Sequence, residues 1–265
     1  MTDPENIKNL LLDVIRLRMN SHPRGLQKAI GPSEIGHPCD RWLGYKLLDV
    51  PKNPNAAERD RWRSTVGVAV HGYLAETFED YNKALGIDLF AVEERVNIGT
   101  IYVGNVHGGD GEDCYGGGDL YIAGVVVDWK IVGKNTLDTV RRAKHPGQQY
   151  QVQVHGYGRG HQRAGRPVEH VSVFYLPAAG PLSQSIFWSE PYDEQVCVDA
   201  LDRVSRIKTA VYTRGTAALA DLEPRDHHCA SRCDWYKPES NDLALGCPGE
   251  NVQSWGIAGL LPPGT

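Results

Sequence analysis

Two aspartates and a lysine beside a short apolar segment are the residues of this chain best suited to chemistry. Asp119 precedes the segment, and Asp128 and Lys130 follow three consecutive valines at its end. Because side chains alternate faces along a β-strand, Asp128 and Lys130 share one face while Trp129 points to the other, where it can pack. Two carboxylates that hold a divalent cation, beside an ammonium that stabilises developing charge, suit the hydrolysis of phosphodiester bonds.

A less specific interpretation of these residues is a hairpin with a solvated cross-strand ion pair, and such surface pairs are common. Three other acids, Asp110, Glu112 and Asp113, lie in the glycine-rich stretch before Asp119 and compete for the role of first carboxylate. We favour Asp119 because it enters a strand and precedes Asp128 by the length of a hairpin.

Two predicted helices offer further polar groups. His71 lies one turn after Gly67, so the face beside the imidazole carries no side chain on the preceding turn, and a metal or a phosphate can approach. The alternative for His71 is a hydrogen bond within the core. Gln153 and Tyr157 are four residues apart and therefore share a helix face, which suits two polar groups that reach one phosphate.

Cysteines predict a second site. Three of the six cysteines lie in the polar, loop-rich final fifty residues: Cys229, Cys233 and Cys247. Three soft ligands need a fourth to complete a tetrahedral site or a cubane cluster. Cys39, which begins a predicted helix, is the preferred fourth ligand. The alternative is His227 or His228, which would favour zinc.

Apolar periodicity predicts the elements that would position these groups. The predicted helices are 4–19, one that Cys39 begins, 64–84, 147–164 and 192–213. The predicted strands are 87–98, 100–106, 118–123, 125–132, 168–176 and 184–189, with a glycine-rich turn region from 104 to 118. The apolar face of 4–19 predicts a packing element.

This order of elements predicts an α/β fold in which a central mixed sheet is flanked by helices. The 265 residues, 41% of them hydrophobic, can bury one sizeable core and a small lobe. We expect an N-terminal helical segment at 1–60, a core at 61–215 and a cysteine-rich tail at 216–265.

Composition bears on partners and compartment. A net charge of −5 is not the footprint of a protein that coats nucleic acid, but it allows a DNA-binding cleft with local basic clusters. Three such clusters occur: Arg59, Arg61 and Arg63; Arg141, Arg142 and Lys144; Arg159, Arg163 and Arg166. The chain shows neither a secretion signal nor an apolar stretch long enough to span a membrane, so we expect a cytoplasmic protein with reduced cysteines.

Together these motifs resemble the PD-(D/E)XK nuclease superfamily, and within it the RecB-like iron-sulfur exonucleases, which include the CRISPR-associated exonuclease family and its phage-encoded relatives. The resemblance extends from about Pro32 to Gly249. The positions that match the family motifs are His71 for its histidine, Asp119 for its first acid, Asp128 and Lys130 for its second acid and lysine, Gln153 and Tyr157 for its Gln-x-x-x-Tyr motif, and Cys39, Cys229, Cys233 and Cys247 for its split cysteine set.

The resemblance implies a restriction-endonuclease-like core and a DNA exonuclease rather than an endonuclease, with one or two Mg²⁺ or Mn²⁺ ions. It implies a role in DNA recombination, repair or processing in a bacterial or phage-infected cell, and it permits a homo-oligomer or a recombination partner protein. The implied metal ligands are His71, Asp119, Asp128 and the backbone carbonyl of Trp129.

The resemblance also assigns the remaining site residues. Lys130 would activate water and stabilise the phosphate, and Gln153 and Tyr157 would hold the scissile strand. The four cysteines would bind a structural 4Fe-4S cluster in a small lobe formed by both ends of the chain, with zinc as the alternative because the C-x3-C spacing departs from the family pattern. The second acid is Asp where the family more often has Glu.

Two rival classes remain. One is a nuclease fold that binds DNA or a protein without cleavage, which is disfavoured because all four catalytic side-chain types are present. The other is a zinc-stapled adaptor in which the tail is the functional part, and a colourless protein that contains zinc without iron would favour it.

Overall fold

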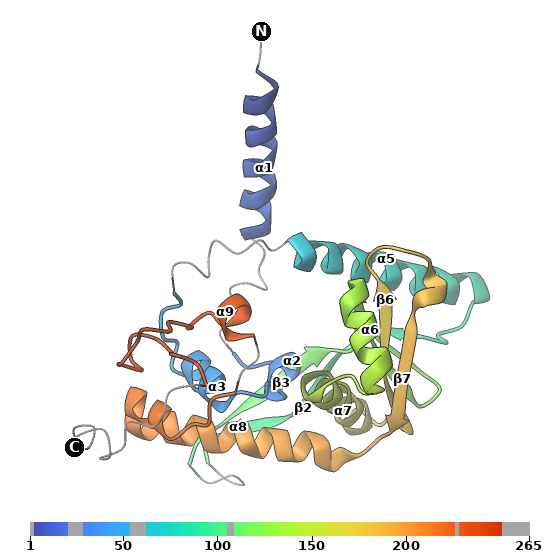
Figure 1. Cartoon of the computed structure of the whole chain (residues 1–265). Coiled ribbons are helices and arrows are strands. Elements are labelled where there is room, and N and C mark those ends of the chain that lie inside the picture. The colour runs from blue at the N-terminus through green and yellow to red at the C-terminus, as the bar shows by residue number, and fades with distance from the viewer. Residues whose placement is uncertain (1–2, 21–28, 54–61, 105–108, 226–227, 251–265) are drawn as a thin grey trace, which may run out of the picture. The chain divides into compact units, whose positions relative to one another are not determined.

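The computed structural model describes residues 3–20, 29–53, 62–104, 109–225 and 228–250 (Figure 1). The chain divides into two compact units, each assembled from separate stretches of sequence. The first contains Met1–Gly36, Asp60–Ile101 and Gly111–Arg203, and the second contains His37–Arg59, Tyr102–Asp110 and Val204–Thr265.

A five-stranded mixed sheet forms the centre of the first unit. Its strands lie in the order β1 (Ala91–Val92), β4 (Leu120–Ile122), β5 (Val125–Val132), β6 (His170–Pro177) and β7 (Ile186–Pro191). Only β5 and β6 run parallel, and the other neighbours are antiparallel. The predicted mixed α/β sheet is therefore confirmed, and the last four predicted strands match observed strands to within about three residues.

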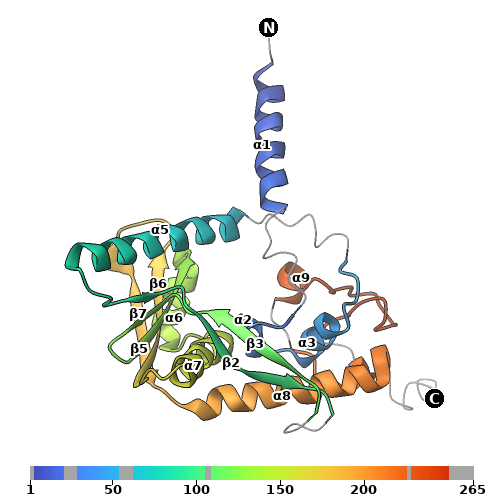
Figure 2. The same cartoon turned by 180° about the vertical axis from the view of Figure 1, so that it is seen from behind.

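One face of this sheet is covered by α5 (Trp62–Leu85), which Figure 2 shows as a long helix alongside the strands. Leu74 and Phe78 of α5 pack against a buried cluster that contains Trp129 of β5. The indole of Trp129 stacks on the Phe78 ring at a centroid distance of 5.5 Å. Alternation along β5 thus sends Trp129 into the core, as predicted, and leaves Asp128 and Lys130 on the other face.

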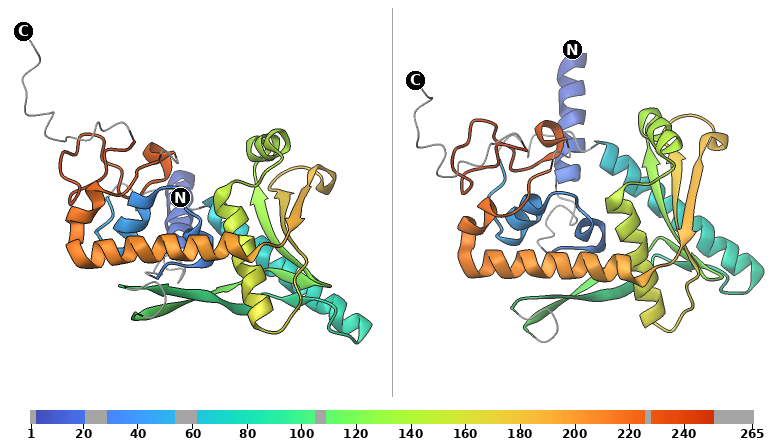
Figure 3. Two further views of the ribbon diagram at one scale, coloured as in Figure 1. Left: turned by 90° about the horizontal axis from the view of Figure 1, so that it is seen from below. Right: turned by 60° about the horizontal axis from the view of Figure 1, so that its bottom comes forward.

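Two helices connect the parallel strands β5 and β6 on that other face: α6 (Lys134–Ala143) and α7 (Gln148–Arg163) (Figure 3). The α7 helix lies close to its neighbours because it carries glycines on its buried side. A Cβ atom at Gly160 would lie only 2.4 Å from Cγ2 of Val96. The sequence prediction missed α6, which buries only Leu137 and Val140.

A two-stranded ribbon pairs β2 (Arg95–Tyr102) with β3 (Gly111–Gly117). The prediction of turns alone across 104–118 was wrong, since β3 forms there, and the strands expected at 87–98 and 100–106 are β1 and the single strand β2. Because β3 buries only Cys114 among seven residues, its sequence lacks the apolar alternation that identifies a strand. Pairing with β2 provides its hydrogen bonds.

Three further elements belong wholly or partly to the first unit. They are α2 (Pro32–Ile35), the turn η2 (Leu182–Gln184) and α8 (Glu194–Arg214). The α8 helix begins in the first unit and ends in the second.

The second unit brings residues 37–53 against the C-terminal part of the chain. It contains α3 (Asp40–Leu47), the turn η3 (Gly215–Ala220) and α9 (Cys229–Arg232). Tyr45 donates a hydrogen bond from Oη to the carbonyl of Leu243 at 2.7 Å, and Trp235 donates from Nε1 to the carbonyl of Val50 at 2.9 Å. These bonds fasten α3 and its following loop to the tail.

The predicted N-terminal helix is α1 (Pro4–Asn20), but it does not show the expected packing against other described residues. Its aliphatic side chains are exposed, including Leu10 at 59% and Leu17 at 73%. Among the described residues, no helix combines the length and the apolar character needed to cross a bilayer.

Candidate metal centre and active site

The β4–β5 hairpin places the two predicted carboxylates next to each other. Ala123 and Gly124 both have positive φ, 45° and 83°, which suits the two-residue turn that joins right-twisted strands. In the resulting register Leu120 pairs with Val127, so the preceding residue Asp119 comes level with Asp128. The Asp119 carboxylate accepts a hydrogen bond at Oδ2 from the backbone N–H of Trp129 at 2.8 Å.

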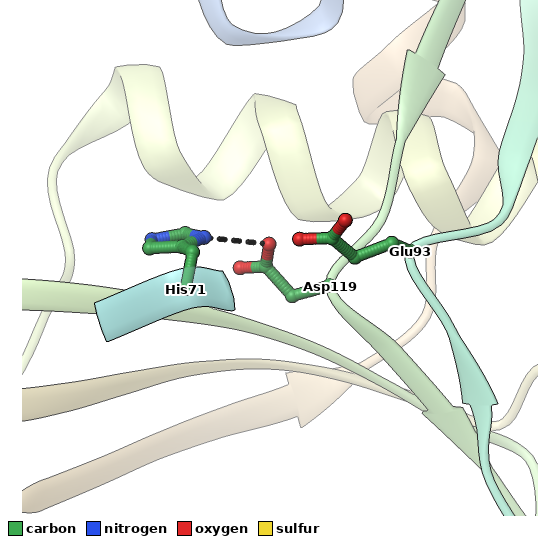
Figure 4. A group of neighbouring side chains, drawn as sticks. All are labelled: His71, Glu93 and Asp119. Atoms are coloured by element: carbon green, nitrogen blue, oxygen red, sulfur yellow. Dashed lines mark hydrogen bonds and ion pairs between the residues drawn. The ribbon is translucent and has the colours of Figure 1, made fainter. Parts of the chain in front are cut away.

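His71, Glu93 and Asp119 form the candidate metal centre (Figure 4). Nδ1 of His71 on α5 lies 3.0 Å from Oδ1 of Asp119. One ligand atom from each of the three residues lies within 4.8 Å of the others. The structure thus joins two predicted residues to Glu93, which the sequence analysis missed. Its only sequence signal is a pair of acids, Glu93 and Glu94, within the predicted strand 87–98.

Glu93 reaches this centre from an unusual backbone conformation. Its φ is 47°, in the left-handed region that a residue with a Cβ adopts at a cost of about 1–2 kcal/mol. Two backbone hydrogen bonds hold this conformation: Glu93 N–H donates to the Asp119 carbonyl at 3.1 Å, and Gly118 N–H donates to the Glu94 carbonyl at 3.3 Å. The Glu94 side chain is held in turn by Arg166, whose Nη2 lies 2.8 Å from Oε1.

Asp128 and Lys130 form an ion pair beside the metal centre, with Nζ 2.6 Å from Oδ2. Burial raises the pKa of Asp128 to about 6, Asp119 adds to this increase, and Lys130 opposes it. Burial alone would lower the pKa of Lys130, but the charge and hydrogen bonding of Asp128 raise it above the ordinary value. The Tyr150 ring, whose centroid lies 4.9 Å from Nζ, covers the ammonium. The lysine therefore stays charged and oriented.

Gln153 and Tyr157 share a face of α7, as predicted, and that face points into the protein. The amide Nε2 of Gln153 lies 3.0 Å from Oδ1 of Asp128 and 3.0 Å from the hydroxyl of Tyr157. Both side chains are buried. Their observed contacts therefore orient Asp128.

The donor set fits a hard divalent cation. Carboxylate oxygens and an imidazole nitrogen are ligands that Mg²⁺ and Mn²⁺ accept. Asp128 is only 2% exposed, and among the described residues Lys130 is the one partner of its Oδ2. Oε1 of Gln153 is buried without a donor among the described residues. Buried oxygens of this kind are costly unless a ligand completes them.

Other sequence candidates lie elsewhere. Asp113 accepts a hydrogen bond from the Thr100 hydroxyl at 2.7 Å, and the acid beside Asp119 is Glu93 rather than Asp110, Glu112 or Asp113. In the basic clusters, Arg141 pairs with Asp138, Arg159 with Glu194 and Arg166 with Glu94. Arg59 and Arg61 lie outside the described residues.

The predicted cluster cysteines all belong to the second unit. Cys39 caps α3, and its Sγ accepts a hydrogen bond from the Trp42 N–H at 3.4 Å. Cys233 and Cys247 both lie close enough to Tyr45 to add to the increase that burial causes in its pKa. Cys229 begins α9, and its carbonyl accepts from the Cys233 N–H at 3.1 Å.

A buried cation accompanies these thiols. Arg41 donates from Nε to the Leu219 carbonyl at 3.0 Å, and its Nη1 lies 3.9 Å from Sγ of Cys247. A buried guanidinium is favoured by nearby negative charge, and ligated thiolates would supply it. His228 has a left-handed backbone before α9, and His227 lies outside the described residues.

The two remaining cysteines have a different environment. Cys114 and Cys197 are buried in the first unit, and burial raises the pKa of each thiol to about 12. They are therefore inert core residues.

Comparison with known proteins gives fold-level similarity. No protein-family model and no curated protein matches the chain. Among solved structures, the chain is similar to SSO0001 with a TM-score of 0.51 and 15% identity, over 93% of this chain and 98% of that one. An alkaline exonuclease, LHK-Exo from Laribacter hongkongensis, aligns with a TM-score of 0.42 and 12% identity, over 70% of this chain and 89% of that one. A complex of LHK-Exo with dAMP aligns with a TM-score of 0.38.

Proposed function

We propose that this chain is a metal-dependent nuclease that hydrolyses phosphodiester bonds in DNA. The observation that carries the proposal is one continuous arrangement of side chains: His71, Glu93 and Asp119 converge at one centre, and the Trp129 amide connects Asp119 to the strand that presents Asp128 and Lys130. Carboxylates and a histidine next to a charged lysine suit phosphoryl chemistry better than a structural ion pair.

Mg²⁺ or Mn²⁺ would be held by His71, Glu93, Asp119 and Asp128, with the backbone carbonyl of Trp129 as a further ligand. When bound, such a cation lowers the pKa of a coordinated water and neutralises phosphate charge.

The remaining side chains have distinct roles in this proposal. Lys130 positions the attacking water and stabilises the negative charge that develops on the phosphate. The ring of Tyr150 covers one side of the Lys130 ammonium and so limits where its Nζ can move. Gln153 and Tyr157 act as positioning residues, because their hydrogen-bond chain fixes the carboxylate of Asp128. The expectation that these two residues also hold the scissile strand stays a prediction.

Within the nuclease class we propose an exonuclease, and we propose a role in phage or bacterial DNA recombination, repair or processing, which the sequence resemblance permits. Cys39, Cys229, Cys233 and Cys247 would hold a 4Fe-4S cluster. When bound, the cluster ties residue 39 to the tail and stabilises the second unit.

Digestion of end-labelled linear DNA and closed circular DNA tests the activity. Protein purified without oxygen is incubated with Mn²⁺, with Mg²⁺ or with a chelator, beside an Asp119→Asn variant. We expect metal-dependent loss of linear DNA only, which Asp119→Asn abolishes. Cleavage of circular DNA would replace the exonuclease by an endonuclease. DNA binding without any cleavage would refute the nuclease proposal and favour a binding module.

The cluster has a separate test that does not depend on activity. Iron and sulfide content and visible absorbance are measured for the wild type, Cys233→Ser and the matched variant Cys114→Ser. We expect iron and sulfide in the wild type and in Cys114→Ser, and their loss in Cys233→Ser. A colourless wild type that contains zinc would show that the thiols form a zinc site instead.

A further inference from the structure

The first helix carries an apolar surface that nothing in its described surroundings covers. Ile7, Leu10, Val14 and Leu17 of α1 are 42%, 59%, 58% and 73% exposed. Helices in proteins gain most of their stability when an apolar face packs, rather than from helix propensity. We therefore expect another surface to pack against this face of α1.

The spacing and types of the apolar residues on α1 indicate what packs against this face. Ile7, Leu10, Val14 and Leu17 follow one another at intervals of three, four and three residues, which is the a, d, a, d pattern of a coiled coil. The β-branched residues Ile7 and Val14 fall at a, and the leucines fall at d. In parallel coiled coils this combination favours two strands.

Charge distinguishes the parallel from the antiparallel arrangement. In the same frame Asp13 occupies position g and Arg18 occupies position e, five residues later. In a parallel pair, g of one helix faces the following e of its partner, so Asp13 meets the second copy's Arg18, and the two-fold axis repeats the contact. An antiparallel pair would bring the two Asp13 carboxylates to the same flank. Among the described residues of one chain, Asp13 forms an exposed pair with Arg16 at 3.5 Å.

We propose that α1 pairs with α1 of a second copy of this chain in a parallel, two-stranded coiled coil. The pattern covers two heptads, fewer than the roughly three to four over which a coiled coil is normally recognised. We therefore expect a dimer that dissociates on dilution. This inference rests on α1 alone and is independent of the proposed nuclease activity.

Sedimentation velocity of the full chain over a concentration series tests the pairing. Leu10→Glu removes a d-position leucine, and Leu12→Glu is the matched control, because Leu12 is on the same helix, is 36% exposed and falls at position f. We expect the wild type and Leu12→Glu to approach the mass of two copies as concentration rises, while Leu10→Glu remains a monomer. A monomeric wild type, another stoichiometry or equal behaviour of the two variants would overturn the proposal.

A charge exchange tests the orientation. Asp13→Arg should weaken the dimer, and the double variant Asp13→Arg with Arg18→Asp should restore it, because the parallel contact is re-formed with reversed charges. A double variant as weak as Asp13→Arg would refute the parallel arrangement.

Discussion

Replacement of Arg166 by methionine should weaken Mn²⁺ binding although Arg166 is not a metal ligand. The guanidinium of Arg166 holds the Glu94 carboxylate in a bidentate ion pair, and this contact lowers the pKa of Glu94. Glu94 in turn follows Glu93, whose left-handed backbone directs its carboxylate toward His71. Without Arg166, the Glu93–Glu94 segment loses one of the contacts that oppose relaxation of this conformation.

The expected loss of Mn²⁺ affinity follows from the backbone conformation of Glu93, and the expected change in stability follows from the exposure of Arg166 and Glu94. A left-handed residue with a Cβ costs about 1–2 kcal/mol. Its relaxation should therefore reduce the Mn²⁺ affinity of the centre by about 5-fold to 30-fold, since tenfold corresponds to about 1.4 kcal/mol. The side chains of Arg166 and Glu94 are 35% and 40% exposed, so the loss of their ion pair should change the free energy of unfolding by less than about 1 kcal/mol. A large effect on affinity should thus accompany a small effect on stability.

Titration with Mn²⁺ in the absence of DNA, followed by the electron paramagnetic resonance of free Mn²⁺, measures the affinity. Arg141→Met is the matched control, because Arg141 pairs with Asp138 on α6. Glu93→Gln should weaken binding at least as much as Arg166→Met. Wild-type affinity in Arg166→Met together with weak binding in Glu93→Gln would refute the positioning role. Wild-type affinity in both variants would remove Glu93 from the metal centre.

Two further predictions concern stability. Gly160→Ala should destabilise the protein by roughly 1–3 kcal/mol, because the new Cβ collides with Val96. Gly72→Ala should stabilise it by about 0.5–1 kcal/mol, because no described atom lies within 4 Å of the added Cβ. Chemical denaturation measures both changes, and equal effects would contradict the packing. Burial and the charge of Arg166 lower the pKa of His161 from 6.5 to about 4, so the unfolded state takes up this proton first as pH falls. The contribution of neutral His161 to the free energy of unfolding is therefore complete above about pH 6.5 and is lost toward pH 4. Between about pH 7.5 and 5.5 the loss should be about 1 kcal/mol. Chemical denaturation at both pH values should show this loss in the wild type and a smaller one in His161→Gln.

The hairpin that carries Asp119 and Asp128 could be predicted because its signals are local. Alternation places Asp128 and Lys130 on one face and Trp129 on the other, and the interval between the acids fits a two-residue turn. Register then follows from the turn, so the proximity of the two carboxylates requires no knowledge of the rest of the fold.

Glu93 could not be predicted in this way, because its place depends on tertiary structure. It lies 26 residues before Asp119, and its direction is set by a positive φ and by hydrogen bonds to the neighbouring strand. Similarly, the i, i+4 spacing of Gln153 and Tyr157 fixes a shared helix face but does not say what this face contacts. The packing of α7 on β5 determines that it contacts Asp128.

The most direct test of the nuclease account compares cleavage of linear DNA by the wild type and by Lys130→Met in the presence of Mn²⁺. Lys134→Met is the control, because Lys134 is an exposed lysine that pairs with Asp138. At Mn²⁺ concentrations that saturate every variant, Lys130→Met should still bind DNA but cleave at least about 100-fold more slowly, while Lys134→Met should cleave normally. Cleavage at the wild-type rate by Lys130→Met would contradict the assignment of this site as the catalytic centre.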